Sequence, residues 1–324
     1  MLRRSDELHE ALLQLLDGAE FDPSPRGEAA FGMCSVALEH GLSLRALMAS
    51  GKTVWMAGAY DALSARLIAQ AGFKAVCTTG YGISASHLGK PDVEIYTMSE
   101  NLAVSAAIVE AVRGTPVVTD CDTGYGGIVN IHRTMRQFEK AGVAGMIFED
   151  QVSPKHCPCL PGAIDLIPIE QGVAKIRAAV EARLNPDTLI IARTDATQMD
   201  DCIARASAYA AAGADVVQPI SGCIRNVEDI RALRQATGKP VSLQILNWLE
   251  TELTREEIES VAALATFPLV PLMTVVQALR DNLAVLAADH GSGKLPRART
   301  SMDEFKGLIG YADVEALQGS CGAD

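Results

Sequence analysis

Two aspartates separated by one residue, Asp120 and Asp122, end a strand-like apolar stretch in the segment VVTDCDTGYGG, residues 117–127. Carboxylates at the end of a buried strand are costly unless a positive group meets them. Residues two apart on a strand point to the same side, so Asp120 and Asp122 can address one divalent cation, directly or through water. Capping of the following helix is the usual alternative for such a pair taken alone.

Polar residues follow three further apolar stretches. The segment TTGYG, residues 78–82, follows one stretch, while Glu149 and Arg193 end two others. Carboxylate oxygens are hard ligands, which suit Mg2+ or Mn2+ and not a thiol-preferring metal. The backbone amides and hydroxyls of residues 78–82 suit a bound carboxylate, and a glycine turn without a ligand is the alternative there. With Glu149 and Arg193 at equivalent depth, a metal site is favoured over a helix cap.

The loop QVSPKHCPCLPG, residues 151–162, contains the cysteine whose sequence neighbours most favour a chemical role, Cys157. Cys157 and Cys159 make a poor zinc site because no second pair of cysteines accompanies them. Lys155 and His156 precede Cys157, and nearby cations favour the thiolate, so the sequence predicts an acid or base role for Cys157. A buried structural thiol is the alternative. The prolines and glycine of this loop are typical of a mobile lid.

Positioning these side chains requires a scaffold that gathers strand ends. From residue 53 onward, a helical pattern, a glycine stop and a short apolar run recur, with glycines at 72, 142, 213 and 238 suited to left-handed helix ends. The apolar runs read as parallel strands buried on both faces. They lie near residues 53–57, 75–78, 116–120, 144–149, 189–193, 215–218, 241–245 and 266–270. Eight such units predict a (β/α)8 TIM-type barrel, with a doubly wound open sheet as the alternative.

The remaining segments and the composition define the expected organisation. We expect a helical extension over residues 1–48, a catalytic barrel over 49–290, and a helical arm over 291–324 that can dock on a neighbouring subunit. A net charge of −12 argues against nucleic acid or an anionic membrane surface as a partner. We see no membrane span or signal core, so the cytoplasm is the expected location. The eight cysteines are expected to be reduced thiols.

Four ordered motifs carry a resemblance to a known superfamily. GAYDALSARLIAQAGFKAV, DCDTGYGG, GMIFEDQVSPKHC and LIIARTDA together resemble the isocitrate lyase and phosphoenolpyruvate mutase superfamily, and within it the 2-methylisocitrate and 2,3-dimethylmalate lyases. The resemblance covers about residues 50–290. It implies a (β/α)8 barrel with a swapped C-terminal helix, a homodimer or homotetramer, and Mg2+, with Mn2+ as a substitute, that holds a small 2-oxo or 2-hydroxy carboxylate.

The resemblance also implies roles for individual residues. The implied metal residues are carboxylates, of which the first binds directly and the others through water: Asp122, Asp120, Asp92 and Glu149. The implied substrate-binding residues lie at the mouth of the barrel: Thr79, Gly80, Tyr81, Asp122, Arg193 and Gln244. The implied catalytic residues are the lid acid Cys157, Lys155 beside it, the charge-neutralising Arg193, and Tyr60 as a candidate initial base.

The lid and the sixth strand distinguish between branches of the superfamily. Lys155 and Cys157 match the lyases, whereas phosphonate mutases and hydrolases resemble PKTNS, with asparagine in place of Cys157. In contrast, the lyases usually have Pro-Glu where this chain has Pro219-Ile220, and the usual asparagine after the seventh strand is Gln244. Cys77 also replaces a common tyrosine.

These features together predict a Mg2+-dependent carbon–carbon lyase. Its expected substrate is a 2-hydroxy di- or tricarboxylate of the methylisocitrate or dimethylmalate type, and one product is a 2-oxo acid. The alternatives are a phosphonopyruvate mutase or hydrolase, an oxaloacetate decarboxylase or hydrolase, and a non-catalytic protein that binds 2-oxo acids.

Overall fold

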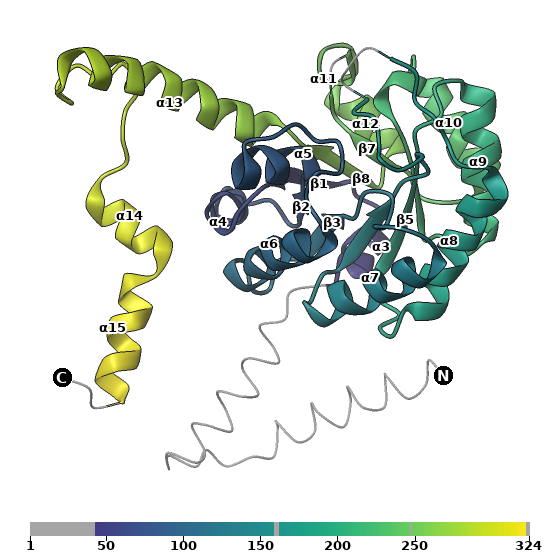
Figure 1. Ribbon diagram of the computed structural model, residues 1–324, viewed down its shortest axis with the longest axis horizontal. Coiled ribbons are helices and arrows are strands. Elements are labelled where there is room, and N and C mark those ends of the chain that lie inside the picture. The colour runs from purple at the N-terminus through teal and green to yellow at the C-terminus, as the bar shows by residue number, and fades with distance from the viewer. Residues whose placement is uncertain (1–42, 159–161, 247, 322–324) are drawn as a thin grey trace. The chain divides into compact units, whose positions relative to one another are not determined.

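Eight parallel strands form the centre of the structure, a computed structural model that describes residues 43–158, 162–246 and 248–321. The strands are hydrogen-bonded in the order β6-β5-β4-β3-β2-β1-β8-β7, and a parallel bridge between Val217 and Val241 brings β6 to β7. Their bounds are β1 Val54–Ala59, β2 Val76–Thr78, β3 Val117–Asp120, β4 Gly145–Phe148, β5 Leu189–Thr194, β6 Val216–Pro219, β7 Ser242–Gln244 and β8 Leu264–Phe267. The (β/α)8 TIM-type fold is therefore confirmed (Figure 1).

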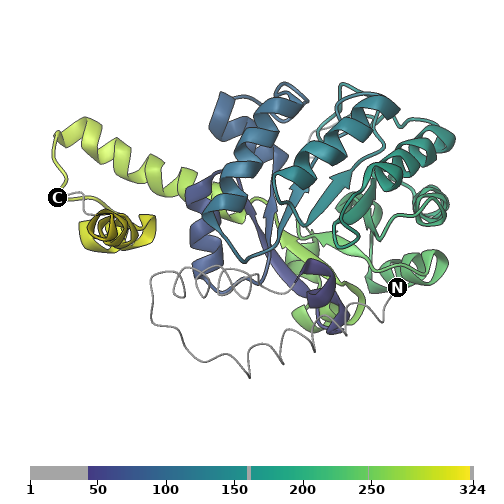
Figure 2. The same cartoon turned by 90° about the horizontal axis from the view of Figure 1, so that it is seen from below.

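Helices connect the strands and surround the barrel (Figure 2). The main connecting helices are α4 Ala62–Gln70, α6 Met98–Ala111, α7 Ile128–Lys140, α8 Ile169–Ala182, α9 Met199–Ala211, α10 Val227–Thr237 and α12 Arg255–Val261. Shorter elements are α3 Leu44–Ala49, α5 Gly80–Ile83, the π-helical turn η1 Ser84–Leu88, the 3-10 turn η2 Ser221–Cys223 and α11 Trp248–Glu252. The glycines predicted to end helices do so with positive φ, at Gly72, Gly142, Gly213 and Gly238.

Apolar side chains fill the barrel interior. Met56, Val118, Ile147 and Ile191, from four different strands, belong to one buried cluster. Leu44 of α3 joins this cluster and is fully buried, so α3 belongs to the same unit as the barrel, residues 42–324. A second cluster lies between the strands and helices α7 and α8. Burial on both faces explains why the strands read as continuous apolar runs.

Seven of the predicted strands start within one residue of their observed positions, and the eighth does not. We expected residues 266–270, but β8 is Leu264–Phe267. Pro268 follows and its backbone carbonyl packs against Gly58, where an added Cβ would lie 2.0 Å from that oxygen. The chain then enters α13 at Val270. Of the expected extension over residues 1–48, residues 1–42 lie outside the described residues.

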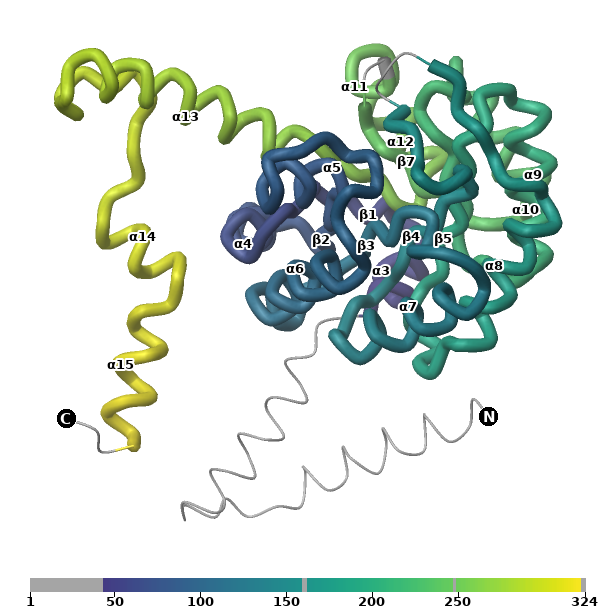
Figure 3. Tube along the Cα trace, in the orientation of Figure 1, coloured from purple at the N-terminus to yellow at the C-terminus, as the bar shows by residue number. Residues whose placement is uncertain are grey.

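Beyond the last strand, the chain forms α13 Val270–Asp289, α14 Met302–Ile309 and α15 Tyr311–Ser320 (Figure 3). Among the described residues, α13 is the one helix long and apolar enough, by length and composition, to cross a membrane, a feature that we overlooked in the sequence. Leu272 of α13 is buried, but other large apolar side chains of α13 are exposed in the single chain, among them Leu279 and Leu283, as are Met302 of α14 and Leu317 of α15. One contact to the barrel is a hydrogen bond from the Arg66 guanidinium of α4 to the carbonyl of Leu308, 2.9 Å.

Candidate active site

A cavity of about 150 Å3 lies at the carboxyl ends of the strands. Active sites of TIM-type barrels lie at this end, because the loops that follow the strands converge there. Strands β2 to β5 and their loops contribute polar lining residues, which include Thr79, Tyr81, Asp92, Asp120, Cys157 and Arg193. Strands β6 to β8 and their loops contribute uncharged ones, which include Gln218, Pro219, Ile220, Gln244, Leu246, Pro268 and Leu269.

A larger cavity, about 590 Å3, lies at the opposite end of the barrel. Its lining includes Leu189 and Ala263, which stand at the start of β5 and just before β8. Arg45 lies there too, and its guanidinium meets Asp215 at 2.9 Å. The amino-terminal end of a barrel serves stability rather than catalysis, so we assign the candidate site to the smaller cavity.

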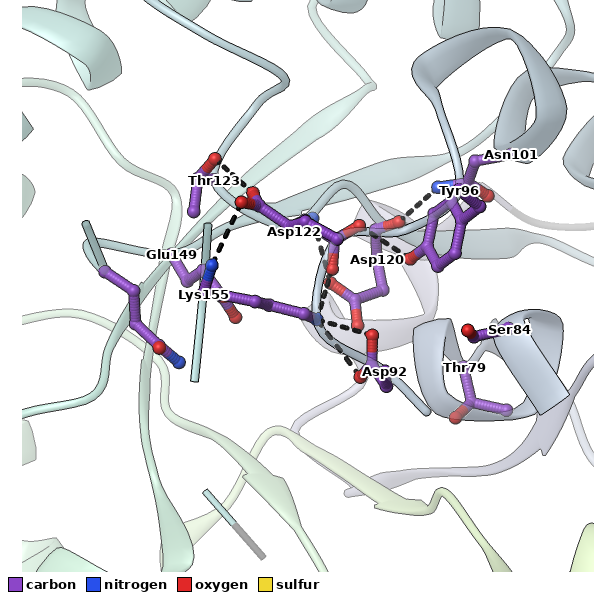
Figure 4. A network of polar contacts seen from close by, with 12 residues as sticks. Thr79, Ser84, Asp92, Tyr96, Asn101, Asp120, Asp122, Thr123, Glu149 and Lys155 are labelled. Atoms are coloured by element: carbon purple, nitrogen blue, oxygen red, sulfur yellow. Dashed lines mark hydrogen bonds and ion pairs between the residues drawn. The ribbon is translucent and has the colours of Figure 1, made fainter. Parts of the chain in front are cut away.

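Asp122 and Lys155 are the centre of a buried polar network beside the small cavity (Figure 4). The Lys155 ammonium forms ion pairs with Asp122 and, at 3.0 Å, with Asp92. The Tyr96 hydroxyl donates to Asp122 Oδ2 at 2.6 Å. All four side chains are nearly or fully buried. The segments that carry them, residues 92–96, 120–122 and the lid, therefore meet at one point.

Asp120 and Asp122 lie close together, but not as successive residues of one strand. Asp120 ends β3, whereas Asp122 has a φ of 49°, in the left-handed region that few non-glycine residues adopt. The Asp122 amide donates to Asp120 Oδ1 at 3.2 Å. A Cβ added at Gly80 would lie within 3.5 Å of both carboxylates. Gly80 therefore lets α5 approach the two acids, a role beyond its predicted contact with substrate.

Arg193 connects the ends of β4 and β5. Its Nη1 lies 2.8 Å from Glu149 Oε2, and its Nε donates to Asp195 Oδ1 at 2.9 Å. Gln151 holds the other oxygen of Asp195 through a bond of 2.6 Å from its Nε2. The guanidinium is thus fixed by two carboxylates in the forked geometry that lysine lacks, with its head at the cavity wall.

Burial outweighs the nearby positive charge in setting the pKa of two of these carboxyl groups. Burial raises the pKa of Asp122 to about 7 although the Lys155 charge opposes this shift. Burial also raises the pKa of Glu149 well above its ordinary value, against the charge of Arg193. Burial alone would lower the pKa of Lys155, but the charges of Asp122 and Glu149 raise it well above the ordinary value. A further cation at this point would stabilise the ionised acids.

The donor set fits a hard divalent cation. Glu149 Oε1 is buried and has no hydrogen-bond partner among the described residues, and the other oxygen of Glu149 meets Arg193 without hydrogen-bond geometry. No three His, Cys, Asp or Glu side chains in the described part of the chain already form a coordination shell. Mg2+ usually keeps several waters and takes one or two protein carboxylates, so a preformed shell is not required. Asp92, Asp120, Asp122 and Glu149 remain the predicted metal residues.

The structure brings most of the predicted site residues together. Seven line the cavity or its rim: Thr79, Tyr81, Asp92, Asp120, Cys157, Arg193 and Gln244. Four others border it through the polar network or packing: Gly80, Asp122, Glu149 and Lys155. Tyr60 is buried and is not among the cavity-lining residues. Its pKa is raised by burial and by the charge of Asp61, which makes Tyr60 a weaker candidate for the initial base.

Sequence reasoning missed Tyr96, Glu94 and Asp195. Tyr96 and Glu94 belong to the stretch DVEIY, residues 92–96, in which every second residue is an acid or a tyrosine, and this alternation was the available signal. Asp195 stood in the quoted motif LIIARTDA but received no role. All three contact residues that we had assigned to the site.

The wall that differs from the lyase pattern is neutral. Ile220 stands where a glutamate was expected and is 8% exposed. Gln218 Oε1 accepts hydrogen bonds from Ser242 Oγ at 2.8 Å and Gln244 Nε2 at 3.4 Å. The two glutamines, Gln218 and Gln244, are therefore hydrogen-bonded to each other. The side of the cavity formed by β6 to β8 presents amide and apolar groups.

Comparisons with known proteins identify the family of this chain. Residues 44–282 match the family model described as phosphoenolpyruvate phosphomutase. The 2,3-dimethylmalate lyase of Eubacterium barkeri is 38% identical over 283 residues, 85% of this chain and 96% of that lyase. A solved oxaloacetate acetylhydrolase with the inhibitor 3,3-difluorooxalacetate has a TM-score of 0.80 and 32% identity, covering 87% of this chain and 97% of that one. A phosphonopyruvate hydrolase solved with oxalate and Mg2+ has a TM-score of 0.76 and 30% identity, covering 85% of this chain and 96% of that one. This chain therefore belongs to the phosphoenolpyruvate phosphomutase family, within the PEP mutase/isocitrate lyase superfamily.

Proposed function

We propose that this protein is a divalent-metal-dependent carbon–carbon lyase that cleaves an alkyl-substituted 2-hydroxy dicarboxylate and releases a 2-oxo acid. The observation that carries the proposal is the meeting of Asp122, Lys155 and Cys157 at one small cavity. Carboxylates for a metal and a lid cysteine as acid are two of the parts that the reaction needs, and a base for the 2-hydroxyl proton is the third. The relative from Eubacterium barkeri, a 2,3-dimethylmalate lyase, supports the same reaction class.

The cavity wall supports the choice of substrate. Arg193 is the one cationic side chain among the residues that line the cavity in the described chain, and two acids already hold it. The opposite wall, with Ile220 and Leu246, offers no counter-ion for a third carboxylate. Apolar surface of this kind stabilises methyl groups, and one well-packed methylene changes kcat/KM by roughly 10- to 200-fold. A methyl-bearing malate therefore suits this cavity better than a tricarboxylate.

The side chains suggest the division of labour. A bound Mg2+ would lower the pKa of the substrate 2-hydroxyl and hold its carboxylate, with Asp122 and Glu149 among its ligands and water anchors. Arg193 and the amides and hydroxyl of the Thr79–Gly80 turn would hold the substrate carboxylates. A base would take the 2-hydroxyl proton, C2 would become the carbonyl carbon of the 2-oxo acid as the bond between C2 and C3 breaks, and the electron pair of that bond would stay on C3. Cys157 on the lid would then give C3 a proton and be left as a thiolate. Lys155 would hold the lid over the site through its ion pairs with Asp92 and Asp122.

An activity panel tests this proposal. Purified protein with Mg2+ is offered malate, 2,3-dimethylmalate, 2-methylisocitrate, oxaloacetate and phosphonopyruvate. We expect cleavage of 2,3-dimethylmalate, its loss with EDTA, and its recovery with Mg2+ or Mn2+. Turnover of oxaloacetate or phosphonopyruvate alone would replace the lyase by the corresponding alternative. Tight binding of oxalate without turnover of any panel member would favour a binding protein.

The wall of the cavity gives a sharper test of substrate choice. Ile220→Ala removes apolar surface without adding charge, and we expect the preference for 2,3-dimethylmalate over malate, as a ratio of kcat/KM, to fall about tenfold. Leu233→Ala, a substitution in the buried core outside the cavity, is the control and should leave that ratio unchanged. An unchanged ratio in Ile220→Ala would contradict the assignment of this wall to the alkyl group.

We also propose that the protein is a homo-oligomer that assembles through its C-terminal arm. Met302 of α14 is 67% exposed, and Val314 and Leu317 of α15 are 53% and 64% exposed, more apolar surface than one chain covers. Light scattering measures the mass of the assembly for the whole chain and for a chain that ends at residue 290. We expect the assembly of the shortened chain to contain fewer subunits. Dimer or tetramer, and a cytoplasmic location, stay predictions.

A further inference from the structure

Glu94 receives three hydrogen bonds from two segments of the active site. Its Oε1 accepts from Thr123 Oγ1 at 2.5 Å. Its Oε2 accepts from Ser153 Oγ at 2.6 Å and from the Lys155 amide at 3.0 Å. Thr123 directly follows Asp122, while Ser153 and Lys155 belong to the lid, so this one carboxylate joins the barrel to the lid.

The backbone at Glu94 is held in an uncommon conformation. Its φ is 57°, in the left-handed region, which carries strain for a residue with a side chain. Such a conformation persists where surrounding contacts over-determine it. Asp92 and Tyr96, two residues to either side, contact Lys155 and Asp122. The short segment 92–96 is therefore held against the site by three of its residues, Asp92, Glu94 and Tyr96.

The bonds to Glu94 set the position of the chemical groups of the lid. The Lys155 amide is held by Glu94 while the ammonium of the same residue reaches Asp92 and Asp122. Two residues later, Cys157 lines the cavity and is 4% exposed. If the lid moved outward, Cys157 would leave the cavity and Lys155 would leave the polar network beside it. A carboxylate suits this role because two oxygens with several lone pairs can accept three donors at once.

We propose that Glu94 is a positioning residue that latches residues 152–158 of the lid over the cavity and thereby places Lys155 and Cys157 for the reaction. The part that concerns catalysis rests on the proposed lyase function. The latch itself concerns only the lid and can be measured without turnover. Loss of the bonds from the lid favours the open lid by at least about tenfold, because bonds to a charged acceptor are among the stronger ones.

Hydrogen exchange of the whole protein tests the latch. In Glu94→Ala, we expect exchange in residues 152–158 to accelerate at least about tenfold and trypsin to cleave faster after Lys155. Ser153→Ala removes one bond from an exposed lid position and should give a smaller acceleration. Glu139→Ala is the matched control, since Glu139 also accepts backbone bonds from another loop, at Leu184 and Asn185, outside the cavity-lining set. Unchanged lid exchange in both Glu94→Ala and Ser153→Ala would overturn the proposal.

Steady-state kinetics test the positioning role. We expect kcat of Glu94→Ala to fall about tenfold or more with a smaller change in KM, and Glu94→Gln, which keeps the shape but not the charge, to recover part of the loss. Faster lid exchange with an unchanged kcat would overturn the link between the latch and the chemistry. A wild-type protein that turns over no panel substrate would refute the lyase function, and hydrogen exchange would still decide on the latch.

Discussion

A side chain added at Gly80 tests how tightly α5 packs against Asp120 and Asp122. In Gly80→Ala, the new Cβ would lie 2.6 Å from Tyr96 Oη, 3.2 Å from Asp120 Oδ2 and 3.5 Å from Asp122 Oδ1. Overpacking of a buried site costs about 1–3 kcal/mol. Tyr96→Phe removes the hydroxyl that donates to Asp122 and costs roughly 1.5–3 kcal/mol, as for other bonds to charged groups. The ring carbons of Tyr96 lie no closer to the new Cβ than these three atoms, so the phenylalanine relieves the clash.

The double variant distinguishes this reasoning from a general loss of packing. Because both substitutions act on one hydroxyl, the destabilisation of Gly80→Ala with Tyr96→Phe should be about 1–2 kcal/mol smaller than the sum of the two single effects. Urea unfolding followed by circular dichroism, with EDTA and at one protein concentration, measures the three changes in the free energy of unfolding. Additivity to within about 0.5 kcal/mol would show that the hydroxyl is not the obstacle and would refute the argument.

Further predictions concern the site and the cysteines. Arg193→Lys keeps the charge but loses the forked contacts, so kcat/KM should fall by roughly 10²–10³ with an unchanged circular dichroism spectrum; a loss under fivefold would contradict the role of the fork. Asp122→Asn should weaken Mn2+ binding in calorimetry by more than about tenfold, whereas Glu139→Gln should not. Iodoacetamide at pH 8 should label the exposed Cys321 and spare Cys121, whose pKa burial raises well above its ordinary value; equal labelling of the native protein, read by mass spectrometry, would contradict that burial.

The barrel was predictable because its signals are local. Each strand is an apolar run, and four of the helix ends carry a glycine that adopts positive φ, at Gly72, Gly142, Gly213 and Gly238. The charged side of the cavity was predictable for the same reason, since Asp120, Glu149 and Arg193 stand at the ends of such runs. Parallel strands in a barrel bring these ends together, so a strand-by-strand reading suffices.

The missed residues depend on contacts between distant segments. Tyr96 reaches Asp122 across 26 positions of sequence, and Glu94 reaches the Lys155 amide across 61. Neither lies in a helix or strand, so no periodicity marks the direction of its side chain. The positive φ of Glu94 is also invisible in the sequence, because its residue type gives no reason to expect it. The alternation in residues 92–96 was the one available hint.

The division of the cavity between two groups of strands has an evolutionary consequence. Side chains at the ends of β2 to β5 hold the charge, and those at the ends of β6 to β8 form the neutral wall. Under the proposed function, a substitution at Ile220 would change what the wall accepts and leave the acids in place. One half of the barrel can retain ancestral chemistry while the other half drifts toward new substrates.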